Sequence, residues 1–375
     1  MTDVLFTFST ETLADALHRQ MMRPPDQMLQ TLAHHAEVER LLVADAPRWI
    51  GALIKRRGPR WPDVLGAPRG HVRPLRLRRH EPSAIDGVRR HVAAQERQLR
   101  YAARRNGLRR PNLITFDPLL AGFGDFGWAG AVTYYARDDW AAFPPRRPWW
   151  EAYDEAYQLI GETGRGVLAV SQPLLDRIAP TGPSAVIVNG IDPTEWHDPD
   201  RPPAWFSSLP RPVVTYVGTV DDRIDPAQIA SLATMPGTVL LVGPSNPQTL
   251  ERMDSKVRHH VARDRRELAA LVCASDAGLI PHRATSLTHA MSPLKLYEYR
   301  AAGLPVASTD LPPIRAEAAV DARIVLAGPA AEDFAAACRT ALERGSDDQA
   351  TRRAYAEAGS WTARHRDALE IILRR

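Results

Sequence analysis

The sequence has only two cysteines, Cys273 and Cys338, in 375 residues. Two cysteines cannot build a disulfide framework or a cysteine-based zinc site, and their scarcity favours a reducing compartment. No apolar run approaches the ~20 residues that a membrane helix needs. The first residues also lack the charged and long apolar regions of a signal peptide. We therefore expect a cytoplasmic protein without membrane spans.

The excess of one sign of charge is also small, because 48 basic residues stand against 44 acidic residues and the net charge is +4. A dedicated nucleic-acid binder usually shows a larger and more clustered excess, so no nucleic acid is expected as a partner. Two arginine-rich segments, residues 55–60 and 73–79, lie near Trp49 and Trp61. They could make peripheral membrane contact with an anionic lipid, or they could form an ordinary solvated face.

Several motifs of cofactor and metal chemistry are missing. There is no D-x-D motif, no G-x-S-x-G elbow and no P-loop, and the two adjacent histidine pairs cannot face one ion on a regular helix. The G-x-G-x-x-G spacing at residues 122–127 does not follow the first strand. That strand ends in residues 9–12 without the glycines that NAD binding requires. We expect no metal site and no cofactor.

What is present is an alternation of short apolar strands with helical patterns, which is typical of doubly wound parallel sheets. The pattern occurs twice and is interrupted by the proline-dense residues 192–212. The predicted strands are Val4–Phe8, Val38–Val43, Asn112–Phe116, Ala131–Tyr135, Val167–Val170 and Ala185–Val188, then Val213–Val217, Thr238–Val242, Ala277–Ile280, Val306–Ser308 and Arg323–Leu326.

The predicted fold class is therefore α/β, with two Rossmann-like domains that face a cleft. We place the N-terminal domain at residues 1–195 and the C-terminal domain at 196–355. A last helix at 356–375 is expected to cross back to the first domain. Ligands of such sheets bind at the carboxyl ends of the strands.

The most informative segment is the predicted helix Pro293–Ala302. Ser292 is a good N-cap, and Pro293 a good first helical residue. The free N–H groups and the positive dipole end of this helix suit a diphosphate, and Lys295 could add a charge. Glu298 lies on the same face about 4–5 Å further along, which is the reach from a diphosphate to a ribose. The alternative is an ordinary helix with a Lys–Glu surface pair.

This segment resembles the nucleotide-sugar-binding helix of the retaining glycosyltransferases of family 4, within glycosyltransferase group 1, which have the glycosyltransferase-B (GT-B) fold. The matching positions are Pro293, Lys295, Glu298, Ala301, Gly303, Pro305, Val306 and Ser308. Three other segments resemble that family in the same order: residues 167–171, 186–192 and 214–219. The resemblance covers roughly residues 165–310 and covers the first 110 poorly.

The resemblance implies a donor site in the C-terminal domain. Glu298 would contact the ribose, and Lys295 and Arg223 would stabilise the diphosphate leaving group. The remaining donor-binding candidates are Gly218, Thr219, His289, Met291, Ser292, Pro293 and Leu294. Two departures stand out: Thr219 replaces the arginine usual after the glycine, and Ala290 replaces the first of two glutamates. For Arg223 the alternative is a surface arginine paired with Asp221 or Asp222, and for His289 a solvated loop histidine.

In the N-terminal domain the acidic pair Asp138 and Asp139 follows a predicted strand. One of them could orient the acceptor hydroxyl or act as a base, while the other caps a helix. Asp117 is a similar carboxylate at the end of a strand. Many members of the family have a histidine at the end of the strand that precedes Asp138, and Tyr135 or Ala136 stands there in this chain.

The sequence thus predicts a metal-independent transferase that moves a sugar from a nucleoside-diphosphate donor to a hydroxyl acceptor with retention of configuration. UDP or dTDP is the default nucleotide. Three alternatives remain: an epimerase of the same fold, a non-catalytic partner that binds nucleotide sugar, and a dinucleotide-dependent dehydrogenase. The glycine-free first turn argues against the dehydrogenase.

Overall fold

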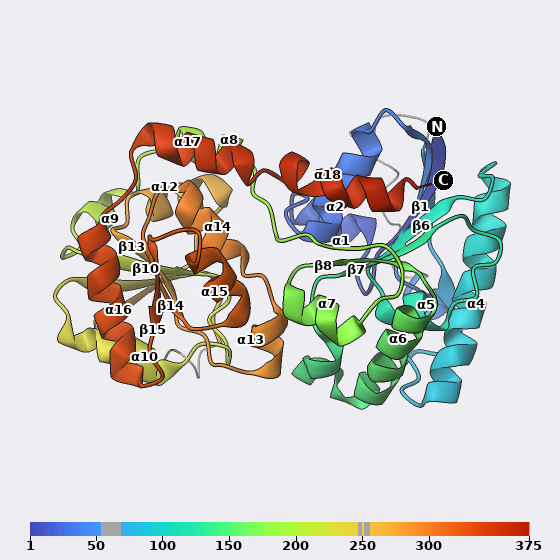
Figure 1. Ribbon diagram of the computed structural model, residues 1–375, viewed down its shortest axis with the longest axis horizontal. Helices are drawn as coiled ribbons and strands as arrows, with labels where there is room; N and C mark the ends of the chain where they lie inside the picture. Colours follow the sequence, from blue (N-terminus) through green and yellow to red (C-terminus); the bar gives the residue numbers. More distant parts are fainter. Residues whose placement is uncertain (54–68, 247–249, 251–255, 375) are drawn as a thin grey trace. The chain divides into compact units, whose positions relative to one another are not determined.

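The computed structural model describes residues 1–53, 69–246, 250 and 256–374. The chain divides into two compact units (Figure 1). Unit 1 comprises Met1–Val188 and Arg364–Arg375, and unit 2 comprises Asn189–Ala363. The division falls just before the proline-dense segment, somewhat earlier than the expected boundary at residue 195. The last helix, α18 (Trp361–Ile372), begins in unit 2 and ends in unit 1.

Among the described residues, unit 1 is built on a seven-stranded parallel sheet with the order β4-β2-β1-β6-β7-β8-β9. Its strands are β1 (Thr2–Thr7), β2 (Val38–Ala44), β4 (Arg69–Val72), β6 (Asn112–Thr115), β7 (Val132–Ala136), β8 (Gly166–Ala169) and β9 (Ser184–Val186). A small ribbon pairs β3 (Arg48–Trp49) with β5 (Leu75–Arg76).

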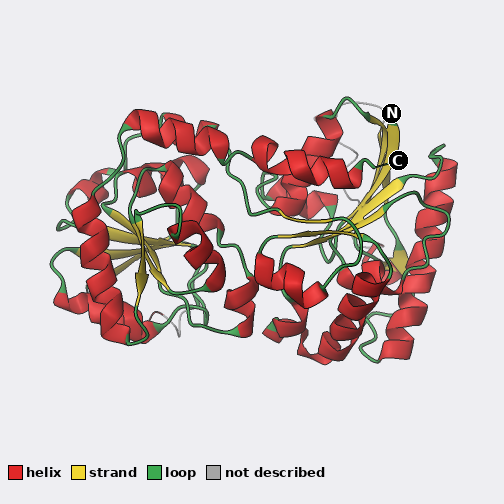
Figure 2. Ribbon diagram, in the orientation of Figure 1, coloured by secondary structure: helices red, strands yellow, loops and turns green. Residues whose placement is uncertain are grey.

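Helices cover both faces of this sheet (Figure 2). One apolar core forms where α4, α5 and α6 pack on the central strands. The helices of unit 1 are α1 (Leu13–His18), α2 (Pro24–His34), α3 (Ile50–Leu53), α4 (Ile85–Arg105), α5 (Pro118–Phe123), α6 (Trp150–Glu162) and α7 (Gln172–Ile178), with the 3₁₀ turns η2 (Trp140–Ala142) and η3 (Pro144–Trp149).

Unit 2 repeats the design with a six-stranded parallel sheet of order β12-β11-β10-β13-β14-β15, again counting only described residues. Its strands are β10 (Val213–Val217), β11 (Thr238–Val242), β12 (Val257–His260), β13 (Ala277–Ile280), β14 (Val306–Thr309) and β15 (Ile324–Ala327). The central strands β10, β11 and β13 are buried along their whole length, as expected for a sheet covered on both faces.

The main core of unit 2 lies between this sheet and the helices α10 and α16. The helices of the unit are α8 (Thr194–His197), α9 (Ala204–Ser207), α10 (Pro226–Ser231), α12 (Arg265–Cys273), α13 (Ser286–Ala290), α14 (Leu294–Ala301), α15 (Pro312–Ala318), α16 (Ala331–Arg344) and α17 (Gln349–Ala358), with the 3₁₀ turn η4 (Leu232–Thr234).

Both sheets reverse their strand order once, between β1 and β6 in unit 1 and between β10 and β13 in unit 2. In open α/β sheets such a reversal opens a crevice at the carboxyl ends of the two strands, and ligands bind there. The α/β class with two Rossmann-like sheets is confirmed, and each unit has one such place.

Candidate functional site

The site in unit 2 is built where β10 and β13 end, together with the first turn of α14. Lys295 extends from α14, its side chain is buried, and its Nζ lies 3.1 Å from Nε2 of His282. The same Nζ donates to the hydroxyl of Tyr216 at 3.3 Å and lies 4.5 Å from the centre of its ring. The tyrosine hydroxyl in turn donates to the carbonyl of Thr219 at 3.0 Å.

The electrostatics of this cluster are unusual, because no carboxylate among the described residues forms an ion pair with Lys295. Burial, and then the charge of Arg223, lower the pKa of the Lys295 amine to about 7. Burial and the nearby Lys295 also hold the pKa of His282 well below its usual range. A buried amine that makes no ion pair with a described residue, beside a neutral histidine, is a candidate place for an anion, although the charges of Glu298 and Asp221 partly offset the lowering of its pKa.

Gly218 makes room for that anion directly after β10. Its φ is +130°, a conformation that favours glycine. A Cβ atom at this position would lie 3.4 Å from Cε and 3.5 Å from Nζ of Lys295. Because Gly218 has no side chain, its backbone lies next to the lysine amine with no side-chain atom between them. Thr219, the next residue, is exposed and contributes its carbonyl to Tyr216.

Arg223 stands at the edge of this cluster. Its guanidinium makes a bidentate pair with Asp221, at 2.9 Å from Nε to Oδ1 and 2.8 Å from Nη2 to Oδ2. The pairing that was the alternative interpretation is therefore present. The charge of Arg223 nevertheless lowers the pKa of Lys295, so it also contributes to the positive potential of the site.

Glu298 lies one turn beyond Lys295 on α14 and is nearly buried. Its Oε1 accepts a hydrogen bond from Nη1 of Arg265 at 2.8 Å. Arg265, the first residue of α12, also pairs with Glu195 and stacks on Trp196. The two carboxylates hold the pKa of Arg265 above its ordinary value. A ribose hydroxyl at Glu298 would therefore meet a carboxylate already fixed in place by an arginine.

The segment before α14 differs from prediction in one respect. Ser292 does not cap the helix, because α14 begins at Leu294 with Pro293 in the capping position and no side-chain cap. Instead, the carbonyl of Ser292 accepts from Nδ2 of Asn189 at 2.6 Å, and its hydroxyl lies 3.1 Å from that of Tyr297. Ser292 thus joins the start of α14 to the first residue of unit 2.

His289 and Met291 lie at the end of α13, immediately before that segment. His289 is exposed in the last turn of the helix, which is the solvated environment weighed as its alternative. Met291 is half-buried and ends α13. The structure therefore brings Gly218, Thr219, Arg223 and Lys295 around one point, while Glu298 lies a turn further along α14.

The two neighbouring acids of unit 1, Asp138 and Asp139, have different surroundings. Asp139 is buried, caps η2 through the N–H of Ala141, and pairs with Arg177 at 2.6 Å. Burial raises its pKa, and Arg177 opposes that rise. Asp138 is 44% exposed, and one of its carboxylate oxygens lies 3.5 Å from Nε of Arg137. Asp139 is therefore occupied as a cap, and Asp138 is the accessible carboxylate of the two.

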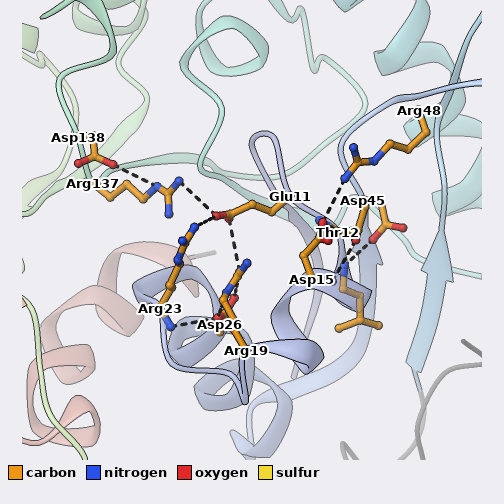
Figure 3. A network of polar contacts seen from close by, with 11 residues as sticks. Glu11, Thr12, Asp15, Arg19, Arg23, Asp26, Asp45, Arg48, Arg137 and Asp138 are labelled. Carbon is orange, nitrogen blue, oxygen red and sulfur yellow. Dashed lines mark hydrogen bonds and ion pairs between the residues drawn. The ribbon is translucent and has the colours of Figure 1, made fainter. Parts of the chain in front are cut away.

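A network that the sequence did not suggest lies beside Asp138 (Figure 3). Glu11, just beyond β1, faces three arginines, with Oε1 2.6 Å from Arg23 and 3.5 Å from Arg137 and Oε2 3.5 Å from Arg19. Burial alone would raise the pKa of this carboxyl, but the arginines hold it below its usual value. The network fixes the loops after β1 and β7 at the carboxyl edge of the sheet.

His282 is the main residue that sequence reasoning missed in unit 2. It follows β13 after a single proline, which places it at the strand-order reversal, and that position could have indicated it. Neither a metal nor a membrane span is indicated within the described part of the chain. No group of three His, Cys, Asp or Glu residues there could hold an ion, and no described helix is long and apolar enough to cross a bilayer.

Comparisons with known proteins agree with this architecture. Residues 211–344 match the family model described as "Glycosyl transferases group 1". A putative teichuronic acid biosynthesis glycosyltransferase of Bacillus subtilis (strain 168) is 28% identical over 168 residues. That match spans 42% of this chain and 42% of the relative, so the chain aligns with less than half of that protein's length.

Many solved structures match nearly the whole chain, and two of them are described next. Sucrose-phosphate synthase from Thermosynechococcus elongatus has a TM-score of 0.63 at 17% identity and covers 100% of this chain and 97% of its own. An α,α-trehalose-phosphate synthase (UDP-forming) from Burkholderia xenovorans has a TM-score of 0.62 at 12% identity and covers 99% and 100%. At these identities the likeness shows the fold alone.

The fold is therefore the GT-B fold, with two Rossmann-like units in one chain. More narrowly, residues 211–344 of unit 2 are similar to the group 1 glycosyl transferases, whose family model they match. This segment contains Gly218, Lys295, His282 and Glu298, so the cationic cluster lies inside the matched segment.

Proposed function

We propose that this chain is an enzyme that transfers a glycosyl group from a nucleoside-diphosphate sugar to a hydroxyl acceptor. The observation that carries the proposal is the buried Lys295 amine, which makes no ion pair with a described residue and lies beside His282 and Gly218 at the strand-order reversal within the segment that matches the group 1 model. A diphosphate supplies the anion that this cluster lacks. The printed name of the trehalose-phosphate synthase describes that enzyme as UDP-forming, which supports UDP as the first nucleotide to test.

The chemistry follows from that placement. The acceptor oxygen forms a bond to the anomeric carbon while the bond from that carbon to the diphosphate oxygen breaks. The proton of the acceptor hydroxyl passes to the departing phosphate oxygen, so the step balances without a metal. Lys295, Arg223 and the N–H groups at the start of α14 stabilise the charge that develops on the leaving group. Departure and attack on the same face of the sugar give retention.

Unit 1 carries the acceptor in this proposal, with Asp138 as its accessible carboxylate. The relative named for teichuronic acid biosynthesis supports a cell-wall saccharide as one acceptor class to test. The basic segment 55–60 and Trp61 lie outside the described residues, whereas most of residues 73–79 are at least partly exposed in unit 1.

Calorimetry tests the donor half of the proposal. The full chain is titrated with UDP, dTDP, GDP, ADP and NAD. We expect one nucleoside diphosphate to bind and Lys295→Met to weaken it more than tenfold, because a charge-assisted contact in a buried site is lost. Lys256→Met, which removes an exposed lysine of unit 2, is the matched control and should bind normally. Binding of NAD alone, or of no nucleotide, contradicts the proposal.

A second pair of variants isolates the ribose contact. Glu298→Ala removes the carboxylate proposed to bind the ribose, whereas Glu195→Ala removes only the other partner of Arg265. We expect Glu298→Ala to weaken nucleotide binding and Glu195→Ala to leave it within about threefold. Equal effects of the two variants would assign Glu298 a purely structural role.

One observation favours a second candidate function, a non-catalytic partner that binds nucleotide sugar. Ala290 occupies the place of a glutamate that the resembling family puts near the transferred sugar, and it is buried at the end of α13. The two functions differ in turnover. An enzyme releases free nucleoside diphosphate from its donor in the presence of acceptor, or slowly to water without one, whereas a binding partner releases none.

A further inference from the structure

An arginine in unit 2 connects three helices beside the candidate donor site. Arg265 is the first residue of α12, and its guanidinium pairs with Glu195 on α8 and with Glu298 on α14. A cation in the first turn of a helix faces the positive end of the helix dipole, which is unfavourable. Arg265 therefore needs compensation at this position, and the two carboxylates supply it.

The guanidinium of Arg265 is held in one orientation. Its Nε lies 3.2 Å from each carboxylate oxygen of Glu195, and its Nη2 contacts Oε2 of the same residue. On the other side, Nη1 donates to Oε1 of Glu298 at 2.8 Å. The central carbon of the guanidinium lies 5.8 Å from the centre of the buried indole ring of Trp196. A planar fork with partners on both sides and a ring beside it has little freedom to rotate.

Glu298 has a second cation close to it on its own helix. Lys295 lies three residues earlier on the same face of α14, a spacing at which lysine and glutamate side chains can pair. Burial and then the charge of Arg223 lower the pKa of the Lys295 amine, and the charge of Glu298 partly opposes them. No ion pair joins these two described residues, however, because the carboxylate of Glu298 pairs with Arg265 instead.

The pairing with Arg265 leaves both groups of α14 available to a ligand. In the part of the chain that the structure describes, the carboxylate of Glu298 accepts a hydrogen bond from Arg265 alone. A carboxylate has about four acceptor positions, so it can still receive two hydroxyl groups. The amine of Lys295 makes its polar contacts with neutral groups, Nε2 of His282 and the hydroxyl of Tyr216. It can therefore still take a negatively charged partner.

We propose that Arg265 is a positioning residue of the donor site, which fixes the carboxylate of Glu298 for the ribose and keeps it from pairing with Lys295. The inference rests on the proposed function, because it concerns the same nucleotide site. Arg265 acts through Glu298 and is assigned no contact with the nucleotide. Without Arg265, Glu298 pairs with the amine of Lys295. The site then loses its ribose contact and also the positive charge that faces the diphosphate.

Calorimetry on the full chain tests the proposal with UDP, or with the diphosphate that wild type binds. Arg265→Met should bind it about thirtyfold or more weakly than wild type, and more weakly than Glu298→Ala, because a charged hydrogen bond and a cation are lost together. In Arg265→Met/Glu298→Ala the released carboxylate is absent. The affinity should therefore recover to within about threefold of Glu298→Ala. Arg266→Met removes the exposed arginine next in the chain and is the matched control, which should bind as wild type does.

A purely structural role predicts the opposite order of affinities. If Arg265 only joins α8, α12 and α14, its loss weakens binding in either background, and the double variant binds more weakly than both single variants. That result would overturn the proposal. Arg265→Lys is the second variant if Arg265→Met fails to fold, because an ammonium keeps the charge but cannot pair with both carboxylates as the planar fork does. It should bind UDP about three- to tenfold more weakly than wild type, and Arg265→Lys/Glu298→Ala should match Glu298→Ala.

A second measurement needs no nucleotide. The chain has only three lysines, Lys55, Lys256 and Lys295. Labelling the lysine side chains with ¹⁵N therefore gives three amine signals in NMR, and Lys295→Met identifies one of them. The titratable and charged groups around this amine are His282, Tyr216, Arg223, Asp221 and Glu298. In Arg265→Met we expect the pKa of Lys295 to rise by about 1 or more, because Glu298 becomes its ion-pair partner. Adding Glu298→Ala should lower the pKa again.

The outcomes separate the two proposals. If wild type binds no nucleoside diphosphate, the proposed function fails, while the signal of Lys295 still decides whether Arg265 keeps the carboxylate away from the amine. If UDP binds, and Arg265→Met neither weakens it nor changes the pKa of Lys295, the positioning role is overturned and the proposed function stands. Weaker binding with an unchanged pKa and no recovery in the double variant would overturn the positioning role as well.

Discussion

At the scale of single residues, the most informative group is the amine of Lys295. Its pKa of about 7 reflects burial and the charge of Arg223, with no described carboxylate in contact. A diphosphate bound beside it would favour the charged form and raise this pKa again. Binding should therefore take up a proton at slightly alkaline pH, and this can be measured directly.

We predict that the affinity for the bound nucleoside diphosphate is greatest at or below pH 7 and falls by tenfold or more between pH 7 and 9. The sign follows because the free site loses its proton above about pH 7, whereas the occupied site keeps it. Calorimetry in two buffers of different ionisation enthalpy should show proton uptake at pH 8. In Lys295→Met the affinity should be weaker at pH 7 and nearly flat up to pH 9. A wild-type profile that is also flat would contradict the assignment.

The pKa of Asp117 is shifted in the opposite direction from that of Lys295, because burial raises the pKa of this carboxyl to about 7. Its contribution to stability is present below pH 4 and is lost as the pH rises through 7, since the ionised form of this buried carboxyl is poorly solvated. We predict that Asp117→Asn, which can still cap α5, raises the melting temperature at pH 8 relative to wild type and raises it less at pH 5. Asp176→Asn, at an exposed position on α7, should change neither value.

At the scale of elements, the attachment of α18 within unit 1 depends on a buried histidine. Nδ1 of His365 lies 2.6 Å from the hydroxyl of Thr31 on α2, and Figure 1 shows α18 and α2 side by side. Burial lowers the pKa of His365 to about 4. The unfolded chain therefore binds a proton at this position between pH 6.5 and 4, while the folded unit does not.

We predict that acidification from pH 7 to pH 4 removes about 3 kcal/mol of the stability of unit 1 through this histidine. His365→Gln can still accept from Thr31 but does not titrate, so its melting temperature should depend less on pH. His289→Gln replaces an exposed histidine and should follow the wild-type profile. Identical pH profiles for His365→Gln and wild type would show that the residue plays no such part.

The elements also show what sequence patterns could and could not supply. The buried strands were predicted within one or two residues, because four or five consecutive apolar residues allow few alternatives. Four described strands escaped prediction: β3 and β5, which form the small ribbon, and β4 and β12, which lie at the edge of their sheets. The strand β12 is polar (Val257-Arg258-His259-His260) because an edge strand faces solvent. Its sequence therefore lacks the apolar pattern that predicts a strand.

The candidate residues of the site came from two sources. Lys295 came from the predicted start of a helix, and Gly218 came from the family resemblance. Ser292 was misassigned, because its partners Asn189 and Tyr297 become neighbours only through tertiary packing. His282 was also missed, although its place two residues after β13, at the strand-order reversal, could have indicated it.

At the scale of the whole molecule, charge is unevenly distributed over the surface even though the net charge is only +4. The solvent side of α4 carries exposed arginines at positions 89, 90, 97, 100, 104 and 105, and an exposed tyrosine, Tyr101. Among the acids nearby, Glu155 neutralises Arg89, and Glu96 is used to hold the backbone at Asp125 and Phe126. The rest of this face remains basic.

We predict that this face of α4 binds anionic membranes, which would bring the chain to a membrane-bound acceptor. In flotation experiments the protein should associate with phosphatidylcholine vesicles that contain phosphatidylglycerol, and not with pure phosphatidylcholine. Sodium chloride at 0.5 M should release it, because it screens surface charge.

Each arginine near such a surface contributes about 1 kcal/mol, so the double variant Arg100→Gln/Arg104→Gln should bind tenfold or more weakly. Arg339→Gln/Arg344→Gln, on the exposed side of α16, makes the same change in net charge and should bind normally. Equal loss in both double variants would show that net charge alone attracts the protein, and equal retention would exclude α4 as the contact surface.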